Sequence, residues 1–315
     1  MTTYGIEFVP GNVNVKQVVN FCKLAESKDI DYAWITNHYN NRHCYPTLAM
    51  IAAATTTLKM GPGIMNSFTD TPAAMASFAC TLNEISDGRA VLGIGPGDLS
   101  TLPKLAIKPE KPVARLGEAI AQIRKLCAGE EVKKSGMQFF DYDGAKLTGV
   151  NLPGKKGIPI YVGAQGPKVL ELAGTVGAGA LINASNPKDF AVAIPIIKAA
   201  CDKVGKKGFD VGAYTAMSID MNEKKARNAP KIVAAFIAAG SSDLRSAMPL
   251  EPWDPSRGTC SRSPVNRTLC RVVEVVKKGK THIYGVEKVM KKLCSTLDTL
   301  DVLVQELYVQ MPLCK

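Results

Sequence analysis

Residues 4–36, YGIEFVPGNVNVKQVVNFCKLAESKDIDYAWIT, contain the pattern that decides the fold. Two short β-rich runs, Tyr4–Val9 and Tyr32–Thr36, stand on either side of a helical pattern from about Val13 to Lys28. A strand, a helix and a second strand in this order form a βαβ unit, whose strands run parallel. The stretch therefore predicts an α/β protein in which helices cover a parallel sheet.

The same alternation continues along the chain, with six strand–helix units expected before residue 205 and two after it. The further expected strands are Leu58–Ile64, Ala90–Ile94, Ile158–Val162, Ala180–Asn183, Val211–Ile219 and Asp301–Val309. The further expected helices are Pro72–Ser86, Pro112–Cys127, Pro167–Val176, Glu223–Ala239 and Val286–Thr296. Eight strands favour a closed (β/α)8 TIM barrel over an open sheet, so we expect one domain over residues 1–315.

Two segments break the alternation. Residues 129–157, rich in Lys and Gly, are expected to be an insertion with a β-hairpin-like excursion around Met137–Leu147. Residues 241–285 form an atypical segment, frequent in Arg, Ser, Pro and Cys and without helical periodicity. No amphipathic helix follows the last expected strand, so the eighth helix of the barrel is expected to be missing.

The formal net charge of +11 favours acidic partners of some kind. Lysines alternate with acidic residues, and no Lys/Arg block is interleaved with aromatic residues as single-strand binders require, so no nucleic-acid partner is expected. Two interpretations of the charge stay open: solvated helix faces, or attraction of an anionic cofactor or substrate.

Cysteines are scattered singly, and no Cys-x-x-Cys or other standard ligand spacing occurs, so neither disulfides nor a metal site is expected. No run of about 18 apolar residues could span a bilayer. Residues Met1–Pro10 lack the basic region of a signal peptide. We therefore expect a cytoplasmic protein without a membrane segment.

Candidate functional residues are those that close the strands, because reactive groups in parallel barrels lie at the carboxyl ends of strands. If Tyr4, Ile6 and Phe8 face the helices, Glu7 points into the barrel mouth. A carboxylate there is costly unless it is used or paired. Glu7 is thus a candidate general acid, with a satisfied ion pair as the alternative.

Polar and flexible residues follow the second and third strands. The run from Thr36 to Asn41 includes Asn37 and His38 and suits hydrogen bonding to a ligand ring, although a merely soluble loop would look similar. After the third strand, the sequence GPGIMN contains Gly63, Ile64 and Asn66 and permits a sharp backbone turn.

The fourth strand ends in GIGPGD, which includes Gly97 and Asp98 and is not a dinucleotide fingerprint, because Asp98 stands where the third glycine belongs. Similarly, Gly279, Lys280 and Thr281 do not complete a P-loop, since Glu274 occupies the position of its first glycine.

The fifth strand ends in Gly163, Ala164, Gln165 and Gly166 and leads directly into a helix, so its backbone amides could meet an anion. Residues 183–186 (NASN), beginning with Asn183, strengthen this signal after the sixth strand.

Taken in order, these strand ends closely resemble those of the deazaflavin-dependent methylenetetrahydromethanopterin reductases, a group of the bacterial luciferase-like superfamily. The resemblance covers roughly three quarters of the chain and includes GIEFVP (5–10), YAWITNHYNNR (32–42), GPGIMN (61–66), EISDGRAVLGIGPGD (84–98), IPIYVGAQGP (158–167) and GALINASNPKDF (179–190). It implies a TIM barrel that binds coenzyme F420 at its mouth and reduces methylenetetrahydromethanopterin to the methyl form.

The resemblance also implies roles for individual residues. A cis peptide between Gly63 and Ile64 would support the deazaflavin ring, and the loop Gly163–Pro167 would bind phosphate. Glu7 would protonate the pterin nitrogen and so open the methylene bridge to the iminium that accepts hydride. Asp98 is the second candidate catalytic residue. The remaining candidate cofactor contacts are Asn37, His38, Asn66, Gly97, Ala164, Gln165, Gly166 and Asn183. The family also forms homo-oligomers, so a dimer or tetramer is expected.

The chain departs from the family in three places. Asn37 stands where the family usually has aspartate, Leu99 and Ser100 replace a more polar pair, and the family's closing sequence is absent beyond Ser241. We therefore hypothesise that the segment from about Ser242 is frame-shifted or otherwise altered. Two alternative functions remain: another F420- or FMN-dependent oxidoreductase of the superfamily, or a degenerate barrel without activity.

Overall fold

The computed structural model describes residues 3–8, 13–98, 101–154, 157–183, 187–216 and 306–312. Its strands are β1 (Thr3–Phe8), β2 (Tyr32–Ile35), β3 (Lys59–Pro62), β4 (Met65–Asn66), β5 (Leu92–Gly95), β6 (Ile160–Gly163), β7 (Gly179–Asn183), β8 (Asp210–Ala216) and β9 (Glu306–Pro312). Its helices are α1 (Val15–Ser27), α2 (Cys44–Ala54), α3 (Pro72–Ile85), the short 3₁₀ helix η1 (Leu102–Leu105), α4 (Pro112–Cys127), α5 (Pro167–Val176) and α6 (Pro187–Lys203).

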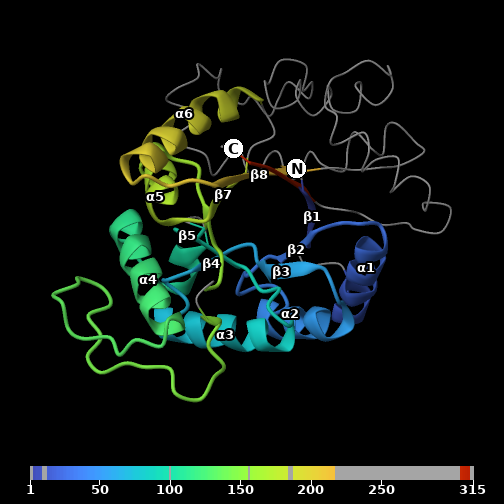
Figure 1. Ribbon diagram of the computed structural model, residues 1–315, viewed down its shortest axis with the longest axis horizontal. Coiled ribbons are helices and arrows are strands. Elements are labelled where there is room, and N and C mark those ends of the chain that lie inside the picture. Colours follow the sequence, from blue (N-terminus) through green and yellow to red (C-terminus); the bar gives the residue numbers. More distant parts are fainter. Residues whose placement is uncertain are drawn as a thin grey trace.

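The strands form one sheet in the order β3-β2-β1-β9-β8-β7-β6-β5-β4. A parallel bridge between Met60 and Ala90 joins the β3 side of this sheet to the β5 side and closes the ring. Figure 1 shows the ring of strands with helices α1 to α6 around its outside. The expected TIM barrel is therefore confirmed.

The last strand corrects one expectation. A strand was expected over Asp301–Val309 and parallel to the others, but β9 covers Glu306–Pro312 and runs antiparallel to both β1 and β8. Its register places Val309 between Tyr4 and Ala213. The edges of β1 and β8 would otherwise present unpaired N–H and C=O groups, and a strand of either direction can pair with them.

Most predicted elements agree with the structure to within a few residues, but no helix range was predicted for α2. This helix is apolar on nearly all sides, so it lacks the alternation of polar and apolar residues that marks a surface helix. The expected helices Glu223–Ala239 and Val286–Thr296 and the atypical segment 241–285 lie outside the described residues.

The expected hairpin around Met137–Leu147 is wrong, since this segment contains no strand, and its one antiparallel bridge pairs Ala145 with Val132, which lies before the segment. Two carboxylates arrange the loop instead. Asp141 accepts the backbone N–H groups of residues 135 to 137, and Glu118 of α4 accepts those of residues 138 to 140. In Figure 1 the loop lies beside α4, outside the ring.

Arg115 of α4 joins this loop to the chain that follows β4. Its guanidinium carbon lies 4.8 Å from the ring centroid of Phe68, 5.3 Å from that of Phe139 and 4.7 Å from that of Phe140. Its Nε also donates to the carbonyl oxygen of Ser67 at 2.9 Å. One planar cation therefore holds two loops together by ring contacts and a hydrogen bond.

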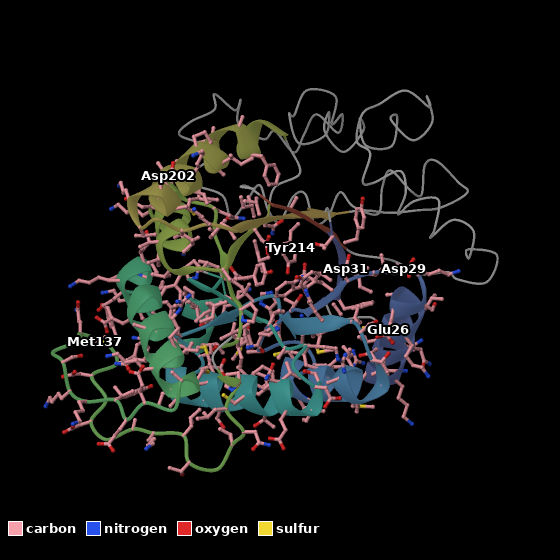
Figure 2. All side chains as sticks on the ribbon, in the orientation of Figure 1. Glu26, Asp29, Asp31, Met137, Asp202 and Tyr214 are labelled. Atoms are coloured by element: carbon pink, nitrogen blue, oxygen red, sulfur yellow. The ribbon has the colours of Figure 1, made fainter. Side chains whose placement is uncertain are left out.

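Alternate residues of the strands pack on opposite sides of the ring. Ile6, Phe8, Ala33 and Ile35 belong to the core between the strands and α1 and α2. A separate cluster fills the interior of the barrel and contains Tyr32, Trp34, Val91, Tyr161, Leu181 and Tyr214, with Ile64 packed against it. Figure 2 shows Tyr214 inside the ring and Met137 well outside it.

Hydrogen bonds cross the amino-terminal end of the barrel. Lys59 Nζ donates to the hydroxyl of Tyr32 at 3.3 Å, and this hydroxyl lies 3.5 Å from that of Tyr161. The Tyr161 hydroxyl donates in turn to Asp210 Oδ2 at 3.0 Å. We call these four residues the barrel floor. They link the first residues of β2, β3 and β8 to β6 through the interior.

Arg89 and Glu26 bind backbone groups on the same side of the barrel. The guanidinium of Arg89 donates to the carbonyl oxygens of Ala52, Thr55, Leu58 and Ser86 and to the Thr55 hydroxyl. Glu26 accepts the backbone N–H groups of residues 56 to 58. Helix ends leave such groups unpaired, so these two side chains fix the chain between α2 and β3.

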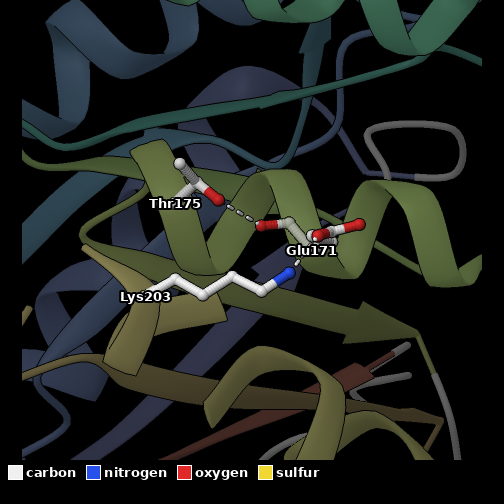
Figure 3. A network of polar contacts seen from close by, with 3 residues as sticks. All are labelled: Glu171, Thr175 and Lys203. Atoms are coloured by element: carbon white, nitrogen blue, oxygen red, sulfur yellow. Dashed lines mark hydrogen bonds and ion pairs between the residues drawn. The ribbon is translucent and has the colours of Figure 1, made fainter. Parts of the chain in front are cut away.

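Helices α5 and α6 are linked at the surface, where Lys203 Nζ lies 3.0 Å from Glu171 Oε1 (Figure 3). Within α5, the Thr175 hydroxyl donates to the Glu171 carbonyl oxygen.

Among the described helices, none has the length and apolar character needed to cross a membrane.

Candidate functional site

Glu7 lies inside the barrel near its carboxyl end, as the alternation along β1 predicts. Only 5% of its surface is exposed. The hydroxyl of Thr36 lies 3.0 Å from Glu7 Oε1 and 3.2 Å from the carbonyl oxygen of Phe8, and it can donate to either. A hydroxyl both donates and accepts, so Thr36 can remain bonded to Glu7 in its charged and its protonated form.

Gly63 brings this carboxyl group close to two aromatic residues. A Cβ atom placed on Gly63 would lie 2.6 Å from the Tyr214 hydroxyl, 3.0 Å from Trp34 Cβ and 3.5 Å from Glu7 Oε1. Glu7, Trp34 and Tyr214 therefore surround one backbone position, and a side chain at residue 63 would not fit among them.

The peptide bond between Gly63 and Ile64 is cis, as the resemblance implied. The Ile64 side chain then lies against two strand-end glycines: a Cβ atom on Gly163 would be 2.6 Å from Ile64 Cδ1, and one on Gly95 would collide with the same atom. The glycines of the fourth and fifth strand ends thus make room for Ile64. The contact with Ile64 explains why these strand ends contain glycine. Their resemblance to a dinucleotide-binding motif is superficial.

Asn66 and Gly97 are neighbours at the ends of β4 and β5. Asn66 Oδ1 accepts the backbone N–H groups of Phe68 and Thr69 at 3.0 and 3.1 Å, so its amide nitrogen points the other way. A Cβ atom on Gly97 would lie 3.1 Å from the Asn66 side chain, and Gly97 has a φ angle of +84°. Glycine suits this position for both reasons.

His38 and Asp98 interact electrostatically across the ends of β2 and β5. Burial lowers the pKa of the His38 imidazole, because the charged form is poorly solvated there, and the negative charge of Asp98 partly offsets this effect. The imidazole is therefore mainly neutral at pH 7 and can both donate and accept a hydrogen bond.

Not every backbone amide of the loop after β6 is available to bind an anion. The N–H of Ala164 donates to the carbonyl oxygen of Leu181, so this amide is already used within the sheet. Gln165 Nε2 donates to the carbonyl oxygen of Asn183 at 3.4 Å, which joins the ends of β6 and β7. Asn183 Oδ1 is buried and has no hydrogen-bond partner among the described residues. Residues 184–186 lie outside them.

The structure therefore brings the predicted residues together at one end of the barrel, and it adds Thr36, Trp34 and Tyr214. Thr36 could have been found from the sequence, since it follows Tyr32 and Trp34 at the spacing of two that points side chains inward. Asp70, which binds Asn37, gave no such signal because it lies beyond the end of β4.

Comparison with known proteins places this chain in a family. The family model described as luciferase-like monooxygenase matches residues 3–261. The 5,10-methylenetetrahydromethanopterin reductase of Archaeoglobus fulgidus is 51% identical over 240 residues, which cover 76% of this chain and 70% of that protein. The reductase of the same name from Methanolobus tindarius is 48% identical, with 77% of this chain and 73% of that protein covered.

A solved structure supports the same grouping. The coenzyme F420-dependent tetrahydromethanopterin reductase of Methanopyrus kandleri superposes with a TM-score of 0.74 at 32% identity, covering 94% of this chain and 90% of that one. The chain belongs to the luciferase-like monooxygenase family and, within it, to the group of the 5,10-methylenetetrahydromethanopterin reductases.

Proposed function

We propose that this protein transfers a hydride between reduced coenzyme F420 and methylenetetrahydromethanopterin, giving methyltetrahydromethanopterin. Its relatives at 41 to 51% identity carry the name of this reductase. The observation that supports the reaction best is the position of Glu7, a buried carboxyl group beside the cis Gly63–Ile64 bond.

The residues at the barrel mouth fit coenzyme F420 in their chemistry. Asn183 Oδ1, a buried acceptor without a partner among the described residues, suits a ring N–H group. The N-terminus of α5 favours the negative charge of a phosphodiester, and the net charge of +11 attracts the anionic tail. The residues that would hold the cofactor are Asn37, His38, Gly63, Ile64, Asn66, Gly97, Gly163, Ala164, Gln165, Gly166 and Asn183. When bound, the cofactor supplies the hydride.

Glu7 acts as the general acid in this proposal. Its carboxyl group holds a proton within the barrel mouth, where burial keeps water away, and delivers it to a nitrogen of the pterin. Thr36 keeps the carboxyl group oriented before and after the transfer, because its hydroxyl can exchange the roles of donor and acceptor.

Asp98 is the second proposed catalytic residue. Its negative charge raises the pKa of the His38 imidazole and partly offsets the effect of burial, so the two side chains act on each other at the ends of β2 and β5. We also propose that residues 1–315 form one domain, that the protein assembles as a homodimer or homotetramer, and that it works in the cytoplasm. The resemblance to the reductase family supports these three statements.

Titration with coenzyme F420 and with FMN, followed by fluorescence, tests the cofactor. Coenzyme F420 should bind, and FMN should bind much more weakly. Turnover is then measured with methylenetetrahydromethanopterin and with a secondary alcohol as alternative substrate. FMN binding equal to or tighter than that of coenzyme F420, or activity with the alcohol alone, would contradict the proposal.

A further inference from the structure

Asp70, a residue outside the predicted site, accepts hydrogen bonds from its neighbour Thr69 and from two distant side chains. Its Oδ1 accepts from the hydroxyl of Tyr45 at 2.8 Å. Its Oδ2 accepts from the hydroxyl of Thr69 at 3.1 Å and from the side-chain nitrogen of Asn37 at 3.4 Å. Asn37 follows β2, Asp70 follows β4, and Tyr45 lies in the first turn of α2.

Tyr45 holds the carboxylate in a fixed place. Its ring stacks on Phe78 of α3, with centroids 4.0 Å apart and an angle of 13° between the planes, and it meets His43 edge-on. Burial first, and then the negative charge of Asp70, raises the pKa of the Tyr45 hydroxyl well above its ordinary value. The hydroxyl therefore stays protonated and serves as a permanent donor to Asp70.

This arrangement determines the orientation of the Asn37 amide. An ionised carboxylate only accepts hydrogen bonds, so the NH₂ group of Asn37 must face Asp70. The carbonyl oxygen of Asn37 is then turned away from Asp70. An amide without such a partner could rotate by 180° and present either atom, because its two ends have nearly the same shape.

We propose that Asp70 is a positioning residue of the active site, which fixes the Asn37 carbonyl oxygen as the hydrogen-bond acceptor for an N–H group of the bound deazaflavin ring. This inference rests on the proposed function and adds to it a residue outside the predicted set. Asp70 itself does not touch the cofactor: it acts through Asn37.

The contact with Asp70 also explains why asparagine, and not aspartate, suits residue 37. With aspartate at residue 37, two carboxylates would face each other at a hydrogen-bonding distance, and one of them would have to bind a proton or move away. In a chain with Asp70, an amide at residue 37 is the side chain that can donate to the carboxylate and still offer an acceptor to the ligand.

The test is a cycle of three variants: Asn37→Asp, Asp70→Asn and the double variant that exchanges the two residues. Coenzyme F420 affinity is measured by fluorescence titration, and the melting temperature by circular dichroism. Asp70→Asn no longer fixes the orientation of the Asn37 amide. It should weaken coenzyme F420 binding about tenfold, the effect of one misplaced hydrogen bond. Asn37→Asp should weaken binding and lower the melting temperature. The double variant restores a donor facing a carboxylate, so both values should return toward those of the parent.

Thr69→Ala is the matched control, because it removes another donor to the same oxygen of Asp70 without touching Asn37. It should leave coenzyme F420 affinity within about twofold of the parent, less than the loss of one net hydrogen bond. Parent-like affinity of Asp70→Asn, an equal loss in Thr69→Ala, or a double variant as weak as the weaker single variant would overturn the inference. A parent protein that does not bind coenzyme F420 at all would instead contradict the proposed function.

Discussion

Glu7 is the residue on which the proposed chemistry depends most. Glu7→Gln keeps the shape of the side chain and its contact with Thr36 but removes the transferable proton. General acid catalysis typically contributes about 100-fold to 10,000-fold, so turnover should fall by this factor while coenzyme F420 affinity stays unchanged. Steady-state kinetics and fluorescence titration measure the two quantities. Turnover close to that of the parent would remove Glu7 from the mechanism.

His38 should make the stability of the protein depend on pH. Its pKa is lowered in the folded state, chiefly by burial, so between this value and the unfolded value of about 6.5 the unfolded chain binds more protons. Above this pH window, His38 therefore does not reduce the free energy of unfolding. As the pH falls through the window, the free energy of unfolding decreases. Urea unfolding of the parent and of His38→Asn over a pH series isolates the effect. The variant should lose less stability on acidification, and parallel curves would contradict the prediction.

At the scale of single residues, part of the site could be predicted from the sequence. The inward direction of Glu7 comes from the alternation along one strand, and the cis bond at Gly63 comes from resemblance. The contact between Asn37 and Asp70 could not be predicted, because it joins residues that are 33 positions apart through the folded geometry of two loops.

At the scale of elements, Arg115 should determine how firmly the 129–157 loop is held. Arg115→Lys keeps the charge but loses the planar group that lies over three rings and donates from Nε. The loss should cost about 1 to 2 kcal/mol of stability. Hydrogen exchange should also become faster at the amides of residues 138 to 140, which is measured by mass spectrometry. Unchanged exchange there would show that Glu118 alone holds the loop.

Two parts of the fold, helix α2 and the 129–157 loop, could not be predicted from periodicity. Strands and amphipathic helices were predicted because each carries its own period of two or 3.6 residues. Helix α2 has too few polar residues to show a period, and the 129–157 loop is arranged by Glu118 and Asp141, whose partners are backbone N–H groups. Nearly every residue has such a group, so no sequence pattern marks the contact.

At the scale of the whole molecule, β9 completes the barrel. Val309 pairs with β1 on one side and β8 on the other, so Val309→Pro removes a backbone donor from the middle of the sheet. The substitution should destabilise the protein by about 1 to 3 kcal/mol, the cost of leaving a backbone acceptor in the sheet unpaired. Urea unfolding measures this cost. A variant as stable as the parent would show that β9 does not contribute to barrel closure.

The closed ring was predictable from the number of strand–helix units, but the direction of its last strand was not. The expectation assumed that every strand follows a helix and therefore runs parallel, whereas pairing alone allows either direction. The hypothesis of an altered segment from about Ser242 stays a prediction, because residues 217–305 lie outside the described part of the chain.

The barrel floor has a consequence for the order of events during turnover. Because the buried rings of Tyr32 and Tyr161 fill the amino-terminal interior and are hydrogen-bonded to Lys59 and Asp210, we expect two ligands to share the carboxyl end of the barrel as their route in and out. The ligand that sits deeper then has to arrive first and depart last. When the outer ligand is abundant, it rebinds before the spent inner one has left and traps it. A large excess of the outer ligand should therefore slow the enzyme instead of saturating it.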